Sequence, residues 1–364
     1  MRRCLVPPAR VLVRLPSWLG DCVMCEPVVR ALYERHARVG NADRLTLVAP
    51  RRLLSLFDGR FAGARRVASE RGRPEDVEAW RSHDVALLLN GSWKSAFTAF
   101  RAGIPERIGI ARGGRGLLLT TGIVPALERG GVPLGAGLRG RFPRAIPRPF
   151  GSVCVELAAL CGIEVRDRTP QLVAAPEAIE GARARLARHG VDVARGFVLA
   201  HAGSRADSAK AFPAARWRAV FEAFARESDL ALVVVCAPGE EANARDAARG
   251  ASRTVLFDDP APELGEVIAL TALSRLVLTA DSGPRHLARA LGVPCVVACG
   301  PTDPRHTADH DATTRVVRVD VACGPCHREV CPLAGSERHA CMTRIDAALV
   351  VRNALDLLRV QREP

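Results

Sequence analysis

Two stretches of the sequence alternate short apolar runs with amphipathic segments, and this alternation constrains the fold more than any other feature. The first predicts strands at 11–15, 45–49 and 85–89, with helices near 23–37, 50–57 and 93–102. The second predicts strands at 197–201, 231–236, 254–257, 276–279 and 295–298, with helices such as 214–226 and 263–272. Strands that alternate with helices form parallel sheets covered by helices. The sequence therefore predicts an α/β fold of two Rossmann-like, doubly wound domains that face a central cleft, where ligands bind at the sheet edges.

The two alternations also set the expected domain boundaries. Residues 1–168 are predicted to form the N-terminal domain and residues 178–342 the C-terminal domain. The connection is expected around Cys161–Ile163 and Pro170–Pro176. The last stretch, 345–364, has apolar positions at helical spacing, and we expect this helix to pack back on the N-terminal domain.

The charge of the chain predicts an anionic partner. The sequence has 52 Lys and Arg against 39 Asp and Glu, a formal net charge of +13. Part of this charge lies in an Arg- and Gly-rich segment, 128–148, within a predicted loop-rich insertion at 112–148 whose role the sequence does not define. Aromatic residues make up only 4% of the chain and do not interleave with a basic run, which argues against nucleic acid.

The apolar runs are too short for a membrane span. Runs such as Leu230–Ala237 are much shorter than the roughly 20 residues that a spanning helix needs. The first residues, Met1–Pro8, carry charge but no adequate apolar core, so they do not match a signal peptide. We expect a cytoplasmic protein, either free or held to a membrane surface by charge.

The segment Thr279–His286 joins a predicted strand to a predicted helix through Asp-Ser-Gly. Such a turn presents free backbone N–H groups and the positive end of the helix dipole, which together favour phosphate. Asp281 can accept from sugar hydroxyls, and His286 can donate to a phosphate oxygen. The alternative is a plain capped helix with Pro284 in its first turn.

A second turn of this type runs from His201 to Pro213 and also follows a predicted strand. Ser204 and Lys210 in this turn can bracket a pyrophosphate, with Lys210 as a strong point charge. A solvated surface lysine is the alternative. Two such turns in one domain favour the phosphate site.

The turn that follows the first predicted strand ends in Gly20-Asp21. It places Asp21 at the carboxyl edge of a parallel sheet, where open α/β folds keep their active sites. The alternative is a carboxylate that stabilises the helix N-terminus. The turn lacks the Gly-x-Gly-x-x-Gly pattern, so a nicotinamide or flavin site is not favoured.

Four of the twelve cysteines form a cluster: Cys323, Cys326, Cys331 and Cys341. A Cys-x-x-Cys pair with two further cysteines nearby fits a structural zinc site, and four reduced, packed thiols fit equally well. No catalytic role is expected for them. Most of the other cysteines lie in apolar surroundings, where small buried thiols are expected.

Together these motifs resemble the ADP-heptose:lipopolysaccharide heptosyltransferases of glycosyltransferase family 9, and most of all their heptosyltransferase II branch. The resemblance is carried by Ser17-Trp18-Leu19-Gly20-Asp21, Asn90-Gly91-Ser92-Trp93-Lys94-Ser95-Ala96, Ala102–Gly109, Gly203–Pro213 and Asp281–His286. It runs from about Val11 to Asp303, and the segment near Cys323 is also similar to one found in many relatives. The family has the GT-B fold, two Rossmann-like domains around a cleft, and works by inversion without a catalytic metal.

The resemblance implies a transfer of heptose from ADP-heptose to the inner core of a lipopolysaccharide precursor, Kdo-lipid A, at the inner-membrane surface. Asp21 would be the general base for the acceptor hydroxyl. The implied donor-binding residues are Ser204, Lys210, Glu240 or its neighbour Glu241, Asp281, Ser282, Gly283 and His286. No cofactor is required for the chemistry, which leaves structural zinc at the four cysteines as the remaining metal question.

An acceptor with phosphates and acidic sugars needs cationic and polar contacts. The acceptor candidates are Ser17, Lys94, Arg107, Arg112 and Arg115. For Arg112 and Arg115 an ordinary surface charge is an equal alternative. The sequence departs from the family at Pro284-Arg285, and 128–148 has no clear counterpart, which affects the identity of the acceptor more than that of the donor.

Two other functions stay open from the sequence. One is a related GT-B transferase with another nucleotide sugar or acceptor. The other is a module that binds nucleotide or anionic lipid without catalysis, against which the retained Asp21 and Lys210 argue.

Overall fold

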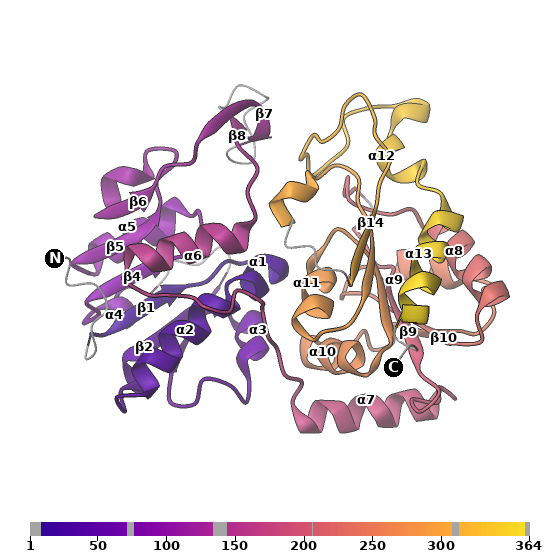
Figure 1. Cartoon of the computed structure of the whole chain (residues 1–364), viewed down its shortest axis with the longest axis horizontal. Coiled ribbons are helices and arrows are strands. Elements are labelled where there is room, and N and C mark those ends of the chain that lie inside the picture. The colour runs from indigo at the N-terminus through magenta and orange to yellow at the C-terminus, as the bar shows by residue number, and fades with distance from the viewer. Residues whose placement is uncertain (1–8, 71–75, 134–143, 206, 308–312, 361–364) are drawn as a thin grey trace. The chain divides into compact units, whose positions relative to one another are not determined.

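The computed structural model describes residues 9–70, 76–133, 144–205, 207–307 and 313–360 (Figure 1). The chain divides into two compact units, Met1–Leu172 and Val173–Pro364. The boundary between them falls inside the connection expected at 170–176. The expectation about Met1–Pro8 lies outside the described residues, as do 134–143 of the Arg- and Gly-rich segment and 361–364 of the last helix.

The N-terminal unit is built on six parallel strands in the order β3-β2-β1-β4-β5-β6. Their bounds are β1 Val11–Arg14, β2 Leu45–Pro50, β3 Arg65–Ser69, β4 Val85–Leu88, β5 Glu106–Ile110 and β6 Thr121–Ile123. The three predicted strands are β1, β2 and β4, whose residues are almost all buried. The loop-rich insertion expected at 112–148 is wrong over 121–123, because β6 pairs with β5 in the main sheet. A separate antiparallel pair is formed by β7 Leu127–Pro133 and β8 Arg144–Ala145.

Helices cover this sheet and return the chain from one strand to the next. They are α1 Leu19–Met24, α2 Glu26–Ala37, α3 Arg51–Leu54, α4 Val77–Trp80, α5 Trp93–Arg101 and α6 Phe150–Leu160, with short 3-10 turns η1 Ala42–Arg44, η2 Ser55–Phe57 and η3 Arg115–Leu118. One face of the sheet, with Leu12 and Leu88, packs against Trp80 of α4 and Ala96 of α5. The helix expected near 23–37 is two helices, α1 and α2, which meet at Cys25.

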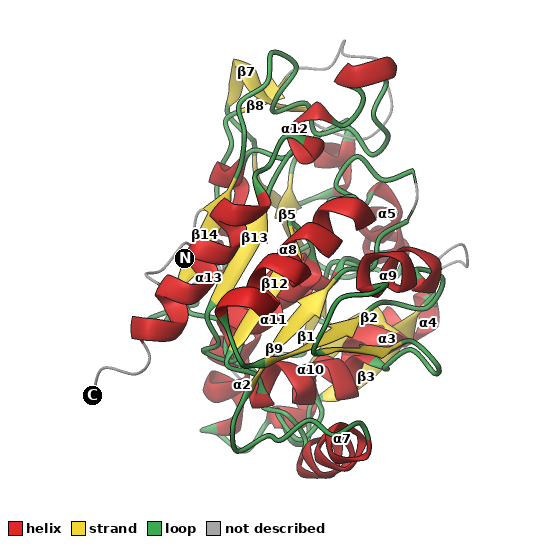
Figure 2. Cartoon of the chain, turned by 90° about the vertical axis from the view of Figure 1, so that its right-hand side faces the viewer, coloured by secondary structure: helices red, strands yellow, loops and turns green. Residues whose placement is uncertain are grey.

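The C-terminal unit repeats the same strand order, β11-β10-β9-β12-β13-β14, again all parallel. Figure 2 labels four neighbouring strands of this sheet, β9, β12, β13 and β14. The bounds are β9 Phe197–His201, β10 Ala231–Val235, β11 Thr254–Phe257, β12 Leu276–Ala280, β13 Cys295–Ala298 and β14 Thr314–Val317. The helices are α7 Pro176–Arg188, α8 Ala214–Glu227, α9 Glu241–Ala248, α10 Leu264–Leu273, α11 Gly283–Ala290, α12 Ala340–Thr343 and α13 Ala347–Val360, with 3-10 turns η4 Pro304–Thr307 and η5 Gly335–Glu337.

Two apolar layers enclose the C-terminal sheet. Side chains of α8, α9 and α13 pack on one face, and those of α7, α10 and α11 on the other. The expectation that the last helix packs on the N-terminal domain is wrong. Val350, Val351 and Leu357 of α13 are buried in the core of the C-terminal unit, where α13 contacts α8. The predicted helix with apolar residues on one side is confirmed as α13, but the spacing of those residues contains no information about which sheet the helix covers.

In the part of the chain that the structure describes, every helix is too short or too polar to cross a bilayer.

Candidate functional site

The strand order reverses once in each unit, between β1 and β4 and between β9 and β12. In open α/β sheets, ligands bind at the carboxyl ends of the strands beside such a reversal. Most of the predicted site residues lie in the loops and first helical turns that follow these four strands. The sequence motifs thus fall where the topology favours ligand binding.

In the C-terminal unit, the turns after β9 and β12 meet through Lys210 and Asp281. The Lys210 Nζ atom lies 3.8 Å from the Asp281 Oδ2 atom. Lys210 is half-exposed and Asp281 is buried, so the ammonium group lies between the carboxylate and solvent. The two turns predicted to hold phosphate are therefore neighbours in space.

Asp281 is held by two more side chains. The Arg285 Nη1 atom donates to Oδ1 at 2.6 Å, and the Thr302 hydroxyl donates to Oδ2. Burial alone would raise the pKa of Asp281, but the charges of Lys210 and Arg285 and the hydrogen bond from Thr302 hold it well below its usual range. Both carboxylate oxygens thus accept from protein donors, and Asp281 orients Lys210. Arg285 can be buried because it forms an ion pair with the buried carboxylate of Asp281.

The start of α11 combines small residues with a neutral histidine. Ser282 is the N-cap, but its side chain makes no capping bond; its hydroxyl donates to the Ala280 carbonyl at 3.3 Å. The first turn, with Gly283, is therefore not a side-chain-capped helix start, which favours the anion-binding interpretation. Burial, with the nearby positive charge of Arg285, lowers the pKa of His286 to about 3. His286 is neutral at physiological pH and can donate a hydrogen bond without adding charge.

The turn after β9 depends on Gly203. A Cβ atom at this position would lie 2.6 Å from the Glu240 Oε2 atom and 2.7 Å from the Cys236 Cβ atom. Glu240 is half-buried, and burial raises its pKa. Of the two candidate carboxylates, Glu240 lies against the turn, whereas Glu241 accepts from the backbone N–H of Gly239.

Three polar residues near these turns were not predicted. The Asn243 side-chain amide donates to the Ala202 carbonyl at 2.7 Å and to the Ser204 hydroxyl at 3.2 Å, which ties α9 to the turn. Thr302 binds Asp281, as described above. His201 ends β9, and its Nε2 atom is buried without a hydrogen-bond partner, while burial lowers its pKa to about 3. Position within the strand-turn-helix unit is the signal that could have identified Asn243 and His201.

In the N-terminal unit, Asp21 lies in the first turn of α1 and is half-buried. Its charge helps burial to raise the pKa of the adjacent Cys22 to about 12, while Arg14 and Arg52 act in the opposite direction. The two arginines are therefore close enough to influence this turn electrostatically. The Arg52 Nη2 atom also donates to the Ser17 carbonyl at 3.4 Å, so the turn before α1 is tied to α3.

Two arginines form a cationic pair at the loop after β4. Arg115 is only 1% exposed, and its Nη1 atom donates to the Asn90 carbonyl at 2.8 Å, while Nε and Nη2 are buried without partners. The Arg112 guanidinium lies directly over Gly91, where a Cβ atom would be 2.2 Å from Nη2. Burial, and then the charge of Arg112, lower the pKa of Arg115 to about 10.

These two guanidinium groups have no carboxylate partner within the described residues. Buried cations are normally compensated by a carboxylate or a bound anion. Arg115 is buried and Arg112 is half-buried, and their role as anion contacts stays a prediction.

The remaining acceptor candidates are less uniform. Lys94 lies in the exposed first turn of α5, a helix that contacts η3, which begins at Arg115. Arg107 lies near the amino end of β5, where its Nε atom donates to the Leu118 carbonyl at 2.7 Å and its Nη1 atom to the Ile104 carbonyl at 2.5 Å. The structure does not bring Arg107 together with Arg112 and Arg115, so we leave it out of the proposed acceptor site.

The four clustered cysteines lie near one another in the C-terminal unit. Burial, followed by the charges of Cys326, Cys323 and Cys331, raises the pKa of the Cys341 thiol to about 11. The Cys331 Sγ atom accepts from the backbone N–H of His339 at 3.3 Å. Among the residues with described positions, no three Cys, His, Asp or Glu side chains are arranged to hold a metal ion. The zinc and packed-thiol alternatives for these four cysteines both stay predictions.

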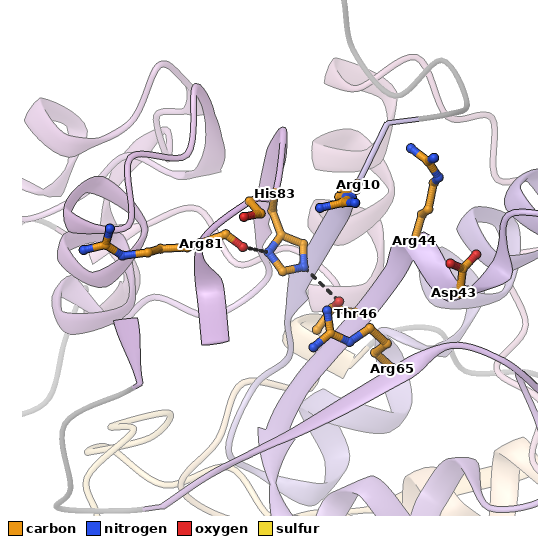
Figure 3. Close-up of a pocket in the computed structure, with 8 residues that line it drawn as sticks. Arg10, Asp43, Arg44, Thr46, Arg65, Arg81 and His83 are labelled. Atoms are coloured by element: carbon orange, nitrogen blue, oxygen red, sulfur yellow. Dashed lines mark hydrogen bonds between the residues drawn. The ribbon is translucent and has the colours of Figure 1, made fainter. Parts of the chain in front are cut away.

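A pocket of about 210 Å³ lies at the opposite, amino-terminal edge of the N-terminal sheet (Figure 3). It is lined by Arg10, Asp43, Arg44, Thr46, Arg65, Arg81, Ser82 and His83. The buried His83 bridges the wall of the pocket: its Nε2 atom lies 2.8 Å from the Thr46 hydroxyl and its Nδ1 atom 3.1 Å from the Arg81 carbonyl. None of the predicted site residues lines this pocket.

Two units with this strand order, each with polar or cationic turns at the reversal, define the class of two-unit Rossmann-like α/β proteins that includes the GT-B glycosyltransferases. A profile described as glycosyltransferase family 9 (heptosyltransferase) matches residues 156–336, so the chain carries a domain of that family. The predicted resemblance is confirmed.

A curated relative and two solved structures agree with this assignment. Lipooligosaccharide heptosyltransferase 2 of Campylobacter jejuni serotype O:2 is 35% identical over 89 residues, which are 24% of this chain and 27% of that protein. The chain thus matches about a quarter of the length of that relative.

The solved structures extend the likeness to nearly the whole chain. The glycosyl transferase family 9 protein of Veillonella parvula has a TM-score of 0.73 at 17% identity and covers 99% of both chains. The E. coli ADP-heptose LPS heptosyltransferase II has a TM-score of 0.69 at 22% identity and covers 98% of this chain and 100% of that one. At these identities the likeness concerns the fold, and the predicted GT-B class is confirmed.

Proposed function

We propose that this protein is an inverting heptosyltransferase that moves heptose from ADP-heptose to the inner core of an anionic lipopolysaccharide precursor. The observation that carries the proposal is the Lys210–Asp281–Arg285 arrangement at the strand reversal of the C-terminal unit. It presents an oriented ammonium group beside the uncapped start of α11. A leaving diphosphate needs this combination of charge and backbone donors.

The reaction is a single displacement. The acceptor hydroxyl oxygen forms a bond to the anomeric carbon of the heptose as the bond from that carbon to the ADP phosphate oxygen breaks. The hydroxyl proton passes to the Asp21 carboxylate, and ADP leaves with the electron pair. Attack on the face opposite the leaving group inverts the anomeric centre.

Charge on the departing ADP would be stabilised by Lys210, by the backbone N–H groups at the start of α11 and by a hydrogen bond from His286. Glu240 beside Gly203 would accept from the ribose hydroxyls. With these groups supplied by the chain, we propose that the step needs no catalytic metal.

The acceptor side of the proposal rests on Arg112 and Arg115, with Lys94 and Ser17 nearby in the same group of loops. The acceptor phosphates and acidic sugars would supply an anion to the buried Arg115 and the half-buried Arg112. The acceptor is anchored in a membrane, so we expect the protein to work at the cytoplasmic face of the inner membrane.

The test is incubation of purified protein with ADP-heptose and truncated lipopolysaccharide acceptors, followed by product mass. Addition of one heptose supports the proposal. In a parallel thermal shift series, ADP should stabilise the protein more than UDP, GDP or NAD by mass action. Transfer from another nucleotide sugar alone, with no response to ADP, would replace the proposal with a related transferase.

A further inference from the structure

The outer face of α5 exposes three aromatic rings in one stripe. Trp93 is 51% exposed, Phe97 39% and Phe100 52%. Residues at positions i, i+4 and i+7 lie on the same side of a helix. The opposite side of α5, with Ala96 and Ala99, is buried against the N-terminal sheet, so the stripe faces away from the core.

The stripe is ordered by its own contacts. The Trp93 and Phe97 rings stack with their centroids 5.5 Å apart, and the Arg107 guanidinium carbon lies 5.5 Å from the Phe100 ring centroid. The 3-10 turn η3 contacts α5 and adds Leu117, which is 92% exposed. Contiguous exposed apolar side chains of this kind mark an interaction surface rather than scattered surface residues.

The surroundings of the stripe are strongly cationic. Residues 91–123 contain five Lys or Arg and a single acidic residue, Glu106. Lys94 and Arg101 belong to α5 itself and are both exposed. A helix with aromatic rings on one side and flanking cations matches segments that lie in the interface of anionic bilayers.

We propose that the stripe of Trp93, Phe97 and Phe100, together with Leu117, docks on the surface of an anionic phospholipid bilayer. The rings enter the boundary between head groups and acyl chains, while Arg101 contacts lipid phosphates. The inference extends the proposed function, which rests on a membrane-anchored acceptor, because it names the surface that meets the membrane. It places that surface beside the loop after β4, which carries Gly91, and the loop after β5, which carries Arg112.

Sedimentation of the full chain with vesicles tests the proposal. We expect binding to vesicles of phosphatidylcholine with phosphatidylglycerol and much weaker binding to phosphatidylcholine alone. The variant Trp93→Ser/Phe97→Ser/Phe100→Ser should bind the anionic vesicles at least about tenfold more weakly. Arg101→Ser alone should weaken binding about fivefold at low salt, an effect that added salt reduces.

Arg65→Ser is the matched control, because it removes the same charge from the opposite edge of the N-terminal sheet. Its vesicle binding should stay within about twofold of wild type. Equal losses for Arg65→Ser and Arg101→Ser would show that net charge alone drives binding, and this outcome would overturn the proposal. Unchanged melting temperature and ADP-induced stabilisation of the triple variant exclude misfolding.

Absence of binding by the wild-type chain, or wild-type binding by the triple variant, would also overturn the proposal. If a second copy or another protein covers the stripe, the triple variant changes the assembly size and leaves vesicle binding intact. Transfer to a soluble acceptor fragment without acyl chains separates the two proposals. Vesicle binding that depends on the stripe, in a protein that transfers no heptose, would reject the proposed function and keep the docking surface.

Discussion

Asp281 shows how a single buried carboxylate can organise a cationic turn. Its two oxygens accept from Arg285 and Thr302, and Lys210 lies 3.8 Å from it on the exposed side. A buried ion pair of this kind adds little net stability, but removal of one partner leaves an uncompensated charge. Asp281 therefore contributes mainly by fixing the position of Lys210, and the intact ion pair adds little net stability.

The variant Asp281→Asn tests this view. It leaves the buried Arg285 without a negative partner, so we expect the free energy of unfolding at pH 7 to fall by about 3 kcal/mol. The folded pKa of Asp281 lies below its unfolded value of about 3.9. Its contribution is thus fully present above that unfolded value and is lost as pH falls further. Urea unfolding at pH 7 and pH 3 should show the wild-type advantage shrinking, whereas the exposed Asp320→Asn should show little difference at either pH.

Lys210→Ala removes the ammonium group that Asp281 orients. We expect ADP to bind about tenfold more weakly and kcat to fall as well, because part of the interaction strengthens as the phosphate bond breaks. Calorimetry with ADP and initial rates measure the two effects. Lys94→Ala is the control, because Lys94 is assigned to the acceptor side, and its ADP affinity should stay unchanged. If Lys210→Ala binds ADP as tightly as wild type, Lys210 is an ordinary surface lysine.

Asp21→Asn tests the proposed base. The substitution keeps the size of the side chain and removes its ability to accept a proton, so kcat should fall by about 10²-fold or more. ADP affinity should stay near wild type, since Asp21 lies in the N-terminal unit and the donor turns in the C-terminal one. Asp43→Asn, at the opposite edge of the N-terminal sheet, serves as the control. Turnover close to wild type would remove Asp21 from the mechanism.

Turn chemistry predicted Asp21, Lys210 and Asp281 from the sequence, because small and polar residues after an apolar strand indicate a loop at the sheet edge. The partners of Asp281 could not be found in this way. Thr302 follows a different strand, and its contact with Asp281 depends on the neighbouring positions of β12 and β13. The burial of Arg115 could not be predicted either, because sequence spacing does not show that its guanidinium lies under the loop after β4.

At the scale of elements, the packing of the β9 turn on α9 gives another prediction. A Cβ atom at Gly203 would clash with Glu240 and Cys236, so Gly203→Ala should cost about 1–3 kcal/mol and weaken ADP binding. Gly181→Ala in α7 is the matched control: no atom lies within 4 Å of its added Cβ, and helix propensity should stabilise it by up to about 1 kcal/mol. Thermal unfolding of both variants with and without ADP gives the comparison, and equal stability of the two would contradict the close approach.

Most predicted strands are central and buried, with the partly buried edge strand β11 as the exception. Of the missed strands, β3, β6 and β14 lie at sheet edges, whereas β5 is internal. β3 begins with two exposed arginines, and β6 and β14 are short and only partly buried. Edge strands bury less apolar surface, so their residues lack the continuous apolar runs that identify a strand in the centre of a parallel sheet. The missed strands complete the 3-2-1-4-5-6 order on both sides, which is why the fold class could be predicted without them.

At the scale of the whole molecule, the same sheet order is used twice with different chemistry at the strand reversal. The C-terminal turns contain Lys210 and the uncapped start of α11, whereas the N-terminal loops contain Asp21 and the pair Arg112 and Arg115. We expect donor binding to survive substitutions that abolish acceptor binding, and the reverse. The family profile falls mainly on the C-terminal unit, at 156–336.

The final prediction concerns metal. In the proposed step Lys210, His286 and backbone N–H groups stabilise the leaving diphosphate, so initial rates should be the same with excess EDTA and with added Mg²⁺. A strict requirement for Mg²⁺ would contradict this distribution of charge. Metal content and melting temperature of the same samples address the four cysteines separately. One equivalent of zinc with a lower melting temperature after chelation would assign a structural site, and metal-free protein of unchanged melting temperature would assign packed thiols. Either result leaves kcat measured before unfolding unchanged, because Cys341 and its neighbours take no part in the proposed displacement.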